Sequence, residues 1–172
     1  MKKYGFVILL ALLSSCRWKT DWQKKQILKK EEAVMNDAKA GKIDTVKLNE
    51  LIKAYEDFAE AHPGDTTAAS FLFKAADFYR YIHQPLKSIG VYEKIYNNFP
   101  NYDKQPIALF LQGFIFENDL QNYSAALVKY HEFLKNYPDH FLAKDVKLSL
   151  QTLGKTPEEL VEEFQKIPSA NN

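Results

Sequence analysis

Apolar residues recur three and four positions apart over most of this chain, in segments separated by Pro, Gly, Asn or Asp. Side chains at these spacings share one face of an α-helix, whereas a strand requires alternation at every second position. The pattern therefore predicts an all-α protein. The expected helices cover residues 21–40, 45–61, 67–82, 85–98, 105–118 and 123–136, followed by one that ends at Gly154 and one that ends near Lys166.

Residues that begin or end helices lie at the expected boundaries. Gly and Pro terminate or open helices, and Asp, Asn and Thr side chains accept hydrogen bonds from the free N–H groups of a first turn. The residues predicted to act in this way are Gly41, Asp65 or Thr66, Pro85, Asp103, Asn122, Asp139, Gly154 and the capping box Thr156-Pro157-Glu158-Glu159.

The last two helices have predicted inward faces. In the seventh helix the inward residues are Phe141, Leu142, Val146, Leu148 and Leu150. In the eighth they are Leu160, Val161 and Phe164, and its polar surface comprises Glu158, Glu159, Glu162 and Glu163. A polar outer surface is what the terminal unit of a repeat stack requires.

One short pattern occurs three times. It begins with a Tyr, has Phe or Ile three positions later on the same helical face, and ends in an aromatic or His residue followed by Pro. The three copies are Tyr55–Pro63, Tyr92–Pro100 and Tyr130–Pro138, and their tyrosines are 37 and 38 positions apart. A fixed period in this range indicates stacked structural repeats.

Each later copy is preceded by a second pattern. Before Tyr130 lie Leu109, Gly113 and Phe116 and then Ala126; before Tyr92 lie Leu72, Ala76 and Tyr79 and then Ser88. This order resembles the tetratricopeptide repeat, a helical hairpin of about 34 residues. The resemblance implies hairpins stacked as a short right-handed solenoid. It also implies that Gly113 and Ala76 lie where paired helices approach most closely, facing Ala126 and Ser88. The first copy matches poorly in its first helix, at Lys39 and Lys42.

The link after each Pro is longer than this template allows. It resembles that of periplasmic lipoproteins with tetratricopeptide repeats, in particular the outer-membrane protein assembly lipoprotein family and the Tol-Pal coordinator family. The resemblance covers roughly residues 44–150. It implies a protein-binding scaffold without enzymatic activity or cofactor, and it leaves the partner open.

The N-terminus has the features of an export signal. A basic start, Met1 to Tyr4, precedes an apolar run from Gly5 to Leu13 that is too short to span a membrane. Leu13-Ser14-Ser15-Cys16 resembles the lipobox of bacterial lipoproteins, which implies removal of residues 1–15 and acylation of Cys16. An ordinary secretory signal with a chance cysteine is the alternative. Cys16 is the only cysteine, so no intramolecular disulfide can form.

The residues after Cys16 bear on the destination. In lipoproteins generally, Asp after the Cys favours the inner membrane and an acidic run favours surface export in some lineages. Arg17 follows here without an acidic run, so we expect the periplasmic face of the outer membrane. Residues 16–24 are expected to form a lipidated tether, 25–167 the repeat domain, and 168–172 a disordered tail.

Two tryptophans lie in the expected tether. Trp18 and Trp22 are the only ones in the chain, and Lys19, Lys24 and Lys25 surround them. Indole rings prefer the membrane interface and Lys prefers anionic head groups. Contact with lipid and packing of one Trp on the first helix are both open interpretations.

Charge and residue content narrow the function classes. The net charge is +1, and removal of Lys2 and Lys3 with the signal leaves 21 basic against 22 acidic residues, so no basic face for nucleic acid is expected. His62, His83, His131 and His140 form no spacing typical of metal ligands. We find no nucleophile motif or phosphate-binding loop, and therefore expect no enzyme, no metal and no cofactor.

What remains is a binding surface. Groove positions transferred from the tetratricopeptide family are Phe73, Asp77, Arg80, Tyr81, Phe110, Phe114, Glu117 and Asn118. Aromatic and charged residues together suit a peptide or a protein helix. Phe110 and Phe114 could instead be buried against a neighbouring unit, and Asp77 could pair with Arg80 at i, i+3.

The expected role is a lipid-anchored, periplasm-facing scaffold in outer-membrane protein assembly or envelope maintenance, bound to an envelope protein or peptide. A lipoprotein that binds a glycan or cell-wall fragment is the alternative, and it requires a deep pocket with convergent polar groups. A self-associating structural protein is a third possibility.

Overall fold

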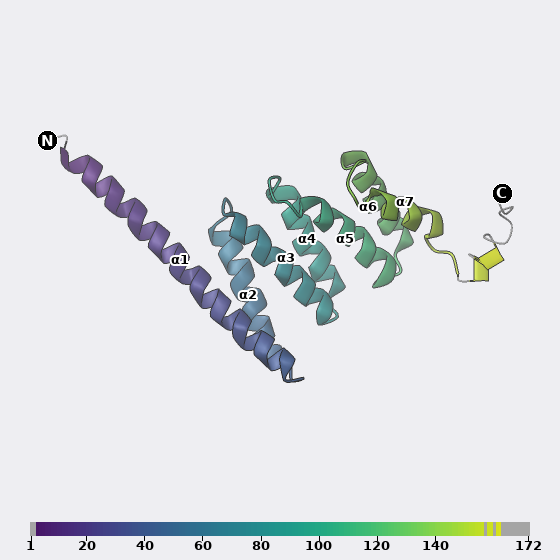
Figure 1. Ribbon diagram of the computed structural model, residues 1–172, viewed down its shortest axis with the longest axis horizontal. Coiled ribbons are helices and arrows are strands. Elements are labelled where there is room, and N and C mark those ends of the chain that lie inside the picture. The colour runs from purple at the N-terminus through teal and green to yellow at the C-terminus, as the bar shows by residue number, and fades with distance from the viewer. Residues whose placement is uncertain (1–2, 157, 160, 163–172) are drawn as a thin grey trace, which may run out of the picture. The chain divides into compact units, whose positions relative to one another are not determined.

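The computed structural model describes the backbone of residues 3–156, 158–159 and 161–162, and the side chains of these residues from 18 onward. Its helices are α1 (Lys3–Lys39), α2 (Thr45–Ala61), α3 (Thr66–Tyr81), α4 (Pro85–Asn98), α5 (Gln105–Asn118), α6 (Tyr123–Asn136) and α7 (Ala143–Thr152) (Figure 1). The described residues contain no strand, and the predicted all-α fold of helical hairpins is confirmed.

The chain divides into two compact units, residues 1–78 and 79–172, with the boundary inside α3. One repeat domain over residues 25–167 was the expectation. Stacked helical repeats contact only their neighbours, which explains why contacts within such a chain separate into units.

The boundaries predicted for α2 to α6 agree with the structure to within one residue. Their caps also agree in part. The Asp65 carboxylate accepts a hydrogen bond from the Thr67 N–H at 2.8 Å, and the Asn122 side chain accepts one from the Ala125 N–H at 3.1 Å. Gly41 follows α1 with a φ of 72°, and Gly154 follows α7 with a φ of 74°. At the predicted capping box, Thr156 and Glu159 exchange hydrogen bonds at 2.8 and 3.2 Å.

Helix α1 is longer than predicted. It begins at Lys3 rather than near residue 21, so the expected tether is helical. No Gly or Pro interrupts residues 6–40, and nothing in the backbone chemistry therefore ends a helix there. The Cys16 side chain lies outside the described residues, as does the expected tail from residue 168.

The predictions for α7 were partly wrong. The helix begins at Ala143 with Leu142 as its N-cap, so Asp139 does not cap it. Val146 is buried, but Phe141 lies in the preceding turn and is 74% exposed. Leu148 is 55% exposed because a residue two positions from buried Val146 points to the opposite side of a helix. In the final segment Val161 is also exposed, whereas Leu160 and Phe164 lie outside the described residues.

The repeated pattern has one backbone geometry in all three copies. His62, Phe99 and Tyr137 follow the helix ends with φ values of −134°, −127° and −136° and ψ values of 60°, 65° and 56°. Each donates its N–H to the carbonyl four residues earlier, at 3.0, 3.0 and 2.8 Å. The next turn is also shared, since the carbonyls of His62, Phe99 and Tyr137 each accept a hydrogen bond from the N–H three residues later. The three copies are therefore structural repeats.

The first tyrosine of each copy is a core residue. Tyr55, Tyr92 and Tyr130 are at most 1% exposed, as are Ile95 and Phe133 at the fourth position of their copies. In the C-terminal unit, Tyr130 and Phe133 belong to a core that continues from α5 to α7. Its buried members are Leu109, Ala126, Tyr130, Phe133, Ala143 and Val146.

The close approach predicted at Gly113 involves a different partner. A Cβ at this glycine would lie 2.7 Å from Cε1 and 2.8 Å from Cδ1 of Tyr130. The nearest atoms thus belong to Tyr130 and Lys129 rather than to Ala126, the partner expected from the family template. Ala126, Ala76 and Ser88 are nevertheless fully buried, as small residues at close-packed positions should be.

In the N-terminal unit, α1 lies along α2 (Figure 1) with few buried apolar residues. Ile27 and Val34 are the only described α1 residues in the buried core. Polar pairs connect α1 to α2, α3 and the intervening turn. They are Gln23–His62 at 2.9 Å, Lys24–Asp65 at 2.7 Å, Lys30–Glu50 at 3.1 Å, Glu31–Lys74 at 2.6 Å and Asp37–Lys47 at 2.7 Å.

Replacement of Gly113 by Ala should lower the free energy of unfolding by about 1–3 kcal/mol, because the fully buried Tyr130 ring must move. The matched control is Gly90→Ala in α4, where a new Cβ would meet nothing within 4 Å. That variant should be more stable by about 0.5–1 kcal/mol, since Ala favours the helix over Gly. Urea denaturation measures both, and equal effects would contradict the close approach at Gly113.

Candidate protein-binding surface

The eight predicted groove residues lie on two helices and fall into both units. Phe73 and Asp77 of α3 belong to the N-terminal unit, where Phe73 is half-buried and Asp77 exposed. The other six belong to the C-terminal unit, two at the end of α3 and four on α5. The arrangement of these six is described below.

Arg80 is held in place by α5 and the residue that follows it. Its Nε lies 2.6 Å and its Nη2 3.0 Å from the two carboxylate oxygens of Asp119, which is the C-cap of α5. The guanidinium also lies over the Phe114 ring, 4.9 Å from the ring centre. A two-point ion pair and a ring contact fix the orientation of a side chain that is otherwise long and variable. The pairing of Arg80 with Asp77 at i, i+3 stays a prediction.

Phe110 and Phe114 are half-buried. The Phe110 ring centre lies 6.0 Å from that of Phe114, 6.1 Å from Tyr130 and 6.2 Å from Phe133. Phe110 therefore packs against α6 of its own hairpin, and its burial against a neighbouring unit stays a prediction. Phe114 presents its ring to Arg80, so each of the two rings has an internal contact.

Glu117 and Asn118 also have contacts within the unit. The Tyr130 hydroxyl donates to the Glu117 carboxylate at 2.5 Å. Burial, with the Glu117 charge adding to it, raises the pKa of Tyr130 far above its usual value. Asn118 donates its side-chain amide to the Phe114 carbonyl at 2.9 Å, within the last turn of α5.

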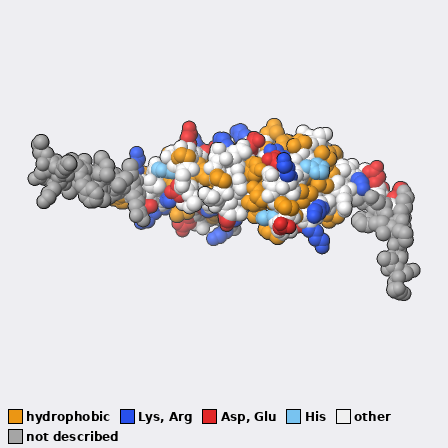
Figure 2. All heavy atoms as spheres, turned by 90° about the horizontal axis from the view of Figure 1, so that it is seen from above, with side chains coloured by type: hydrophobic (Ala, Val, Ile, Leu, Met, Phe, Trp, Pro, Cys, Tyr) orange, Lys and Arg blue, Asp and Glu red, His pale blue; other side chains and the backbone are white. Residues whose placement is uncertain are grey.

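Tyr81 differs from the other five, because it is the large aromatic of the group that is mostly exposed, at 57%. It directly follows Arg80, whose position is fixed. Figure 2 shows one face of the molecule, on which apolar side chains gather over the C-terminal unit among charges of both signs. Tyr and Arg are both enriched at protein interfaces, and Tyr81 follows the oriented Arg80 at about 100° around the helix.

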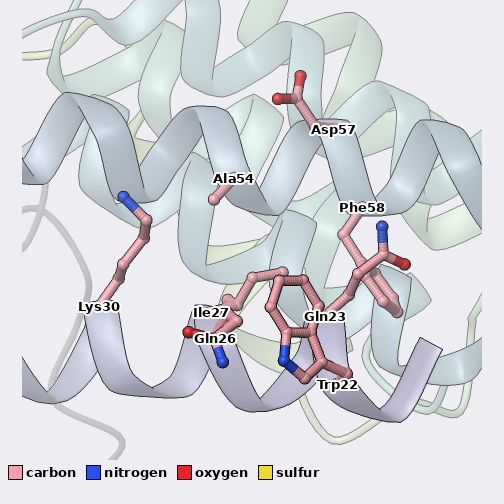
Figure 3. Close-up of a pocket in the computed structure, with 8 residues that line it drawn as sticks. All are labelled: Trp22, Gln23, Gln26, Ile27, Lys30, Ala54, Asp57 and Phe58. Carbon is pink, nitrogen blue, oxygen red and sulfur yellow. The ribbon is translucent and has the colours of Figure 1, made fainter. Parts of the chain in front are cut away.

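A hollow of about 220 Å³ lies between α1 and α2 in the N-terminal unit (Figure 3). Ile27, Ala54 and Phe58 give it apolar walls, and Trp22, Gln23, Gln26, Lys30 and Asp57 complete its lining. Sequence reasoning did not find this hollow. The apolar periodicity of each helix was visible, but it does not encode the register of α1 on α2, in which Lys30 lies opposite Glu50.

The two tryptophans are not core residues. Trp18 is 78% and Trp22 58% exposed. Trp22 lines the edge of the hollow (Figure 3) and does not fill it. Trp22 therefore packs only slightly on the helices.

Two of the four histidines, His62 and His140, make polar contacts within the protein. The His62 ring lies 2.9 Å from the Gln23 amide oxygen, and His140 Nδ1 accepts from the Leu142 N–H at 3.2 Å. Among the described residues, no three His, Cys, Asp or Glu side chains are grouped closely enough to hold a metal ion. Within the same part of the chain, no helix combines the length and apolarity needed to cross a bilayer.

A family model of the tetratricopeptide repeat matches residues 107–140. The match covers most of α5, all of α6 and the turn that follows. It therefore includes Tyr130–Pro138, the third copy of the repeat pattern. The chain therefore contains a tetratricopeptide repeat, and this type of repeat commonly serves protein–protein interaction. No curated protein matches the sequence.

Stability should fall at alkaline pH because two core tyrosines resist ionisation. Burial raises the pKa of Tyr55 and of Tyr130, and the neighbouring Glu31 and Glu117 carboxylates add to the effect. An unfolded tyrosine loses its proton near pH ~10 while the folded one keeps it. The free energy of unfolding should therefore be unaffected below pH ~10 and fall above it by about 1.4 kcal/mol per pH unit for each tyrosine.

Urea denaturation at a series of pH values tests this expectation. Tyr130→Phe should reduce the alkaline slope, because it removes one of the ionisable groups whose pKa is raised in the folded protein. The control Tyr81→Phe removes a hydroxyl from a mostly exposed residue and should keep the slope. A slope that is equally steep in Tyr130→Phe would show that the Tyr130 proton does not contribute.

Proposed function

We propose that the protein is a lipid-anchored scaffold on the periplasmic face of the outer membrane. It holds another envelope protein through the repeat surface of its C-terminal unit. By resemblance to the two lipoprotein families, its role lies in outer-membrane protein assembly or envelope maintenance.

The fixed position of Arg80 beside exposed Tyr81 is the observation that carries the binding role. Binding of a partner to this pair costs little side-chain entropy at Arg80, because Asp119 and Phe114 already orient the Arg80 side chain. The matching of α5 and α6 to a tetratricopeptide repeat supports the same interpretation.

The anchor rests on the sequence of the first sixteen residues and is supported by the course of α1. The helix continues through residue 16 to its packed part. Gln23 lies seven positions after Cys16 on this helix, a rise of roughly 10 Å. Gln23 and Lys24 are bound to the α2–α3 turn through His62 and Asp65. A lipid on Cys16 would therefore keep the N-terminal unit close to the bilayer.

The first test of the anchor is acylation. Cells that express the full chain are fed a labelled fatty acid, and the protein is recovered from separated membrane fractions. We expect label on the wild type in the outer-membrane fraction, and loss of both label and membrane recovery in Cys16→Ser. Recovery of unlabelled wild-type protein from the soluble fraction would rule out the anchor.

The second test addresses the partner. A photo-crosslinking residue at position 81 should capture a distinct envelope protein in cells. The same residue at His131, an exposed position on α6, is the matched control. Arg80→Ala should reduce the capture at position 81, and Arg80→Lys should restore little of it because Lys cannot form the two-point pair with Asp119. Equal crosslinking from positions 81 and 131 would contradict the proposed surface.

A further inference from the structure

The outer side of α1 carries a row of four exposed residues, in which the structure adds Lys29 to three residues of the tryptophan segment described from the sequence. They are Trp18, Trp22, Lys25 and Lys29, at spacings of four, three and four, which follow one face of a helix. All four are exposed. We refer to them as the Trp-Lys stripe.

The stripe lies opposite the side of α1 that packs on the protein. Buried Ile27 and Val34 are nine and sixteen residues after Trp18, which places both about half a turn away from it around the helix. The side chains that pair with α2, α3 and their connecting turn, such as Lys24 and Glu31, lie toward that packed side. Packing of α1 thus leaves the stripe facing outward.

We propose that the Trp-Lys stripe lies on the anionic surface of a lipid bilayer, as a membrane contact in addition to the lipid on Cys16. The inference rests on the proposed function, which brings this part of the chain to a membrane. Indole rings favour the zone between head groups and acyl chains, and lysines are attracted to anionic head groups. Stable attachment commonly combines an acyl chain with such a second contact.

The exposure of the two rings points to this occupant. Trp18 is 78% and Trp22 58% exposed, and they lie two and six residues after the predicted lipidation site. Trp22 stands at the rim of the hollow between α1 and α2 (Figure 3), so its outer face is available to a flat surface.

The charges around the stripe define how strong the lipid preference is. Exposed Lys19 adds to Lys25 and Lys29, while exposed Asp21 and Glu32 oppose them. The local excess is therefore one positive charge. The tryptophans provide most of the contact, and the lysines select anionic over neutral lipid.

Tryptophan fluorescence tests the proposal in the full chain, because Trp18 and Trp22 are the only tryptophans. The protein is incorporated into vesicles of phosphatidylcholine alone or with phosphatidylglycerol, and lipids with nitroxide labels at shallow or deep positions serve as quenchers. We expect quenching by the shallow label, and at least twofold less quenching in neutral vesicles. Trp18→Phe and Trp22→Phe each isolate the remaining ring, and both rings should be quenched.

Charge reversal separates the stripe from other membrane contacts. Lys25→Glu with Lys29→Glu should reduce shallow-label quenching in anionic vesicles to the level in neutral vesicles. The matched control, Lys135→Glu with Lys147→Glu, makes the same charge change at exposed positions of α6 and α7 and should have no effect. A chain that sediments with vesicles while both rings stay open to a water-soluble quencher would overturn the proposal. The mass of the mature protein reports separately whether Cys16 is acylated, so failure of the anchor and failure of the stripe are distinguishable.

Discussion

The contact between the Tyr130 ring and the backbone of Gly113 is the constraint on which the C-terminal unit depends. The ring lies 2.7 Å from the place of a Cβ at position 113, so any side chain there would force the ring or the two helices to shift. The buried ring fills the space between the two helices, and close-packed protein interiors tolerate little added volume. The hydroxyl end reaches Glu117 and so has a polar partner. One residue therefore sets the distance between two helices and satisfies its own polar group.

The same tyrosine position serves the N-terminal unit in a different way. Tyr55 is fully buried and contacts Phe71 at 4.9 Å between ring centres. The charge that influences its pKa is Glu31 of α1, a helix outside its own repeat pattern. Glu31 is in turn bound to Lys74 of α3. In the N-terminal unit, α1 thus places the Glu31 carboxylate near Tyr55. In the C-terminal unit, α5 places the Glu117 carboxylate near Tyr130. These polar pairs add to the apolar contacts of Ile27 and Val34, and the partly buried ones are screened less by salt than exposed ones.

Much of the fold could be predicted from the sequence because the determinants of α2 to α6 are local. Apolar spacing and residues such as Asp65, Pro85 and Asn122 fix where these helices begin and end, and all act within a few positions. The failures concern choices made by distant contacts. The start of α7 depends on a turn in which His140, not Asp139, accepts the N–H bond. The polar packed side of α1 depends on partners on α2, α3 and the turn between them, and no periodicity within α1 reveals them.

The predicted groove residues show a similar division between what is local and what is not. Their positions on α3 and α5 followed from the repeat pattern, but their contacts did not. Phe110 packs against the core, Glu117 accepts a hydrogen bond from the Tyr130 hydroxyl, and Asn118 donates its side-chain amide to the Phe114 carbonyl. A residue with an internal partner can contact another protein only through its remaining surface, or at the expense of that contact. This argument shifts the expected binding energy away from Phe110 and Glu117. It favours Tyr81 and the outward face of Arg80, where the side chain is already oriented and the ring beside it is exposed.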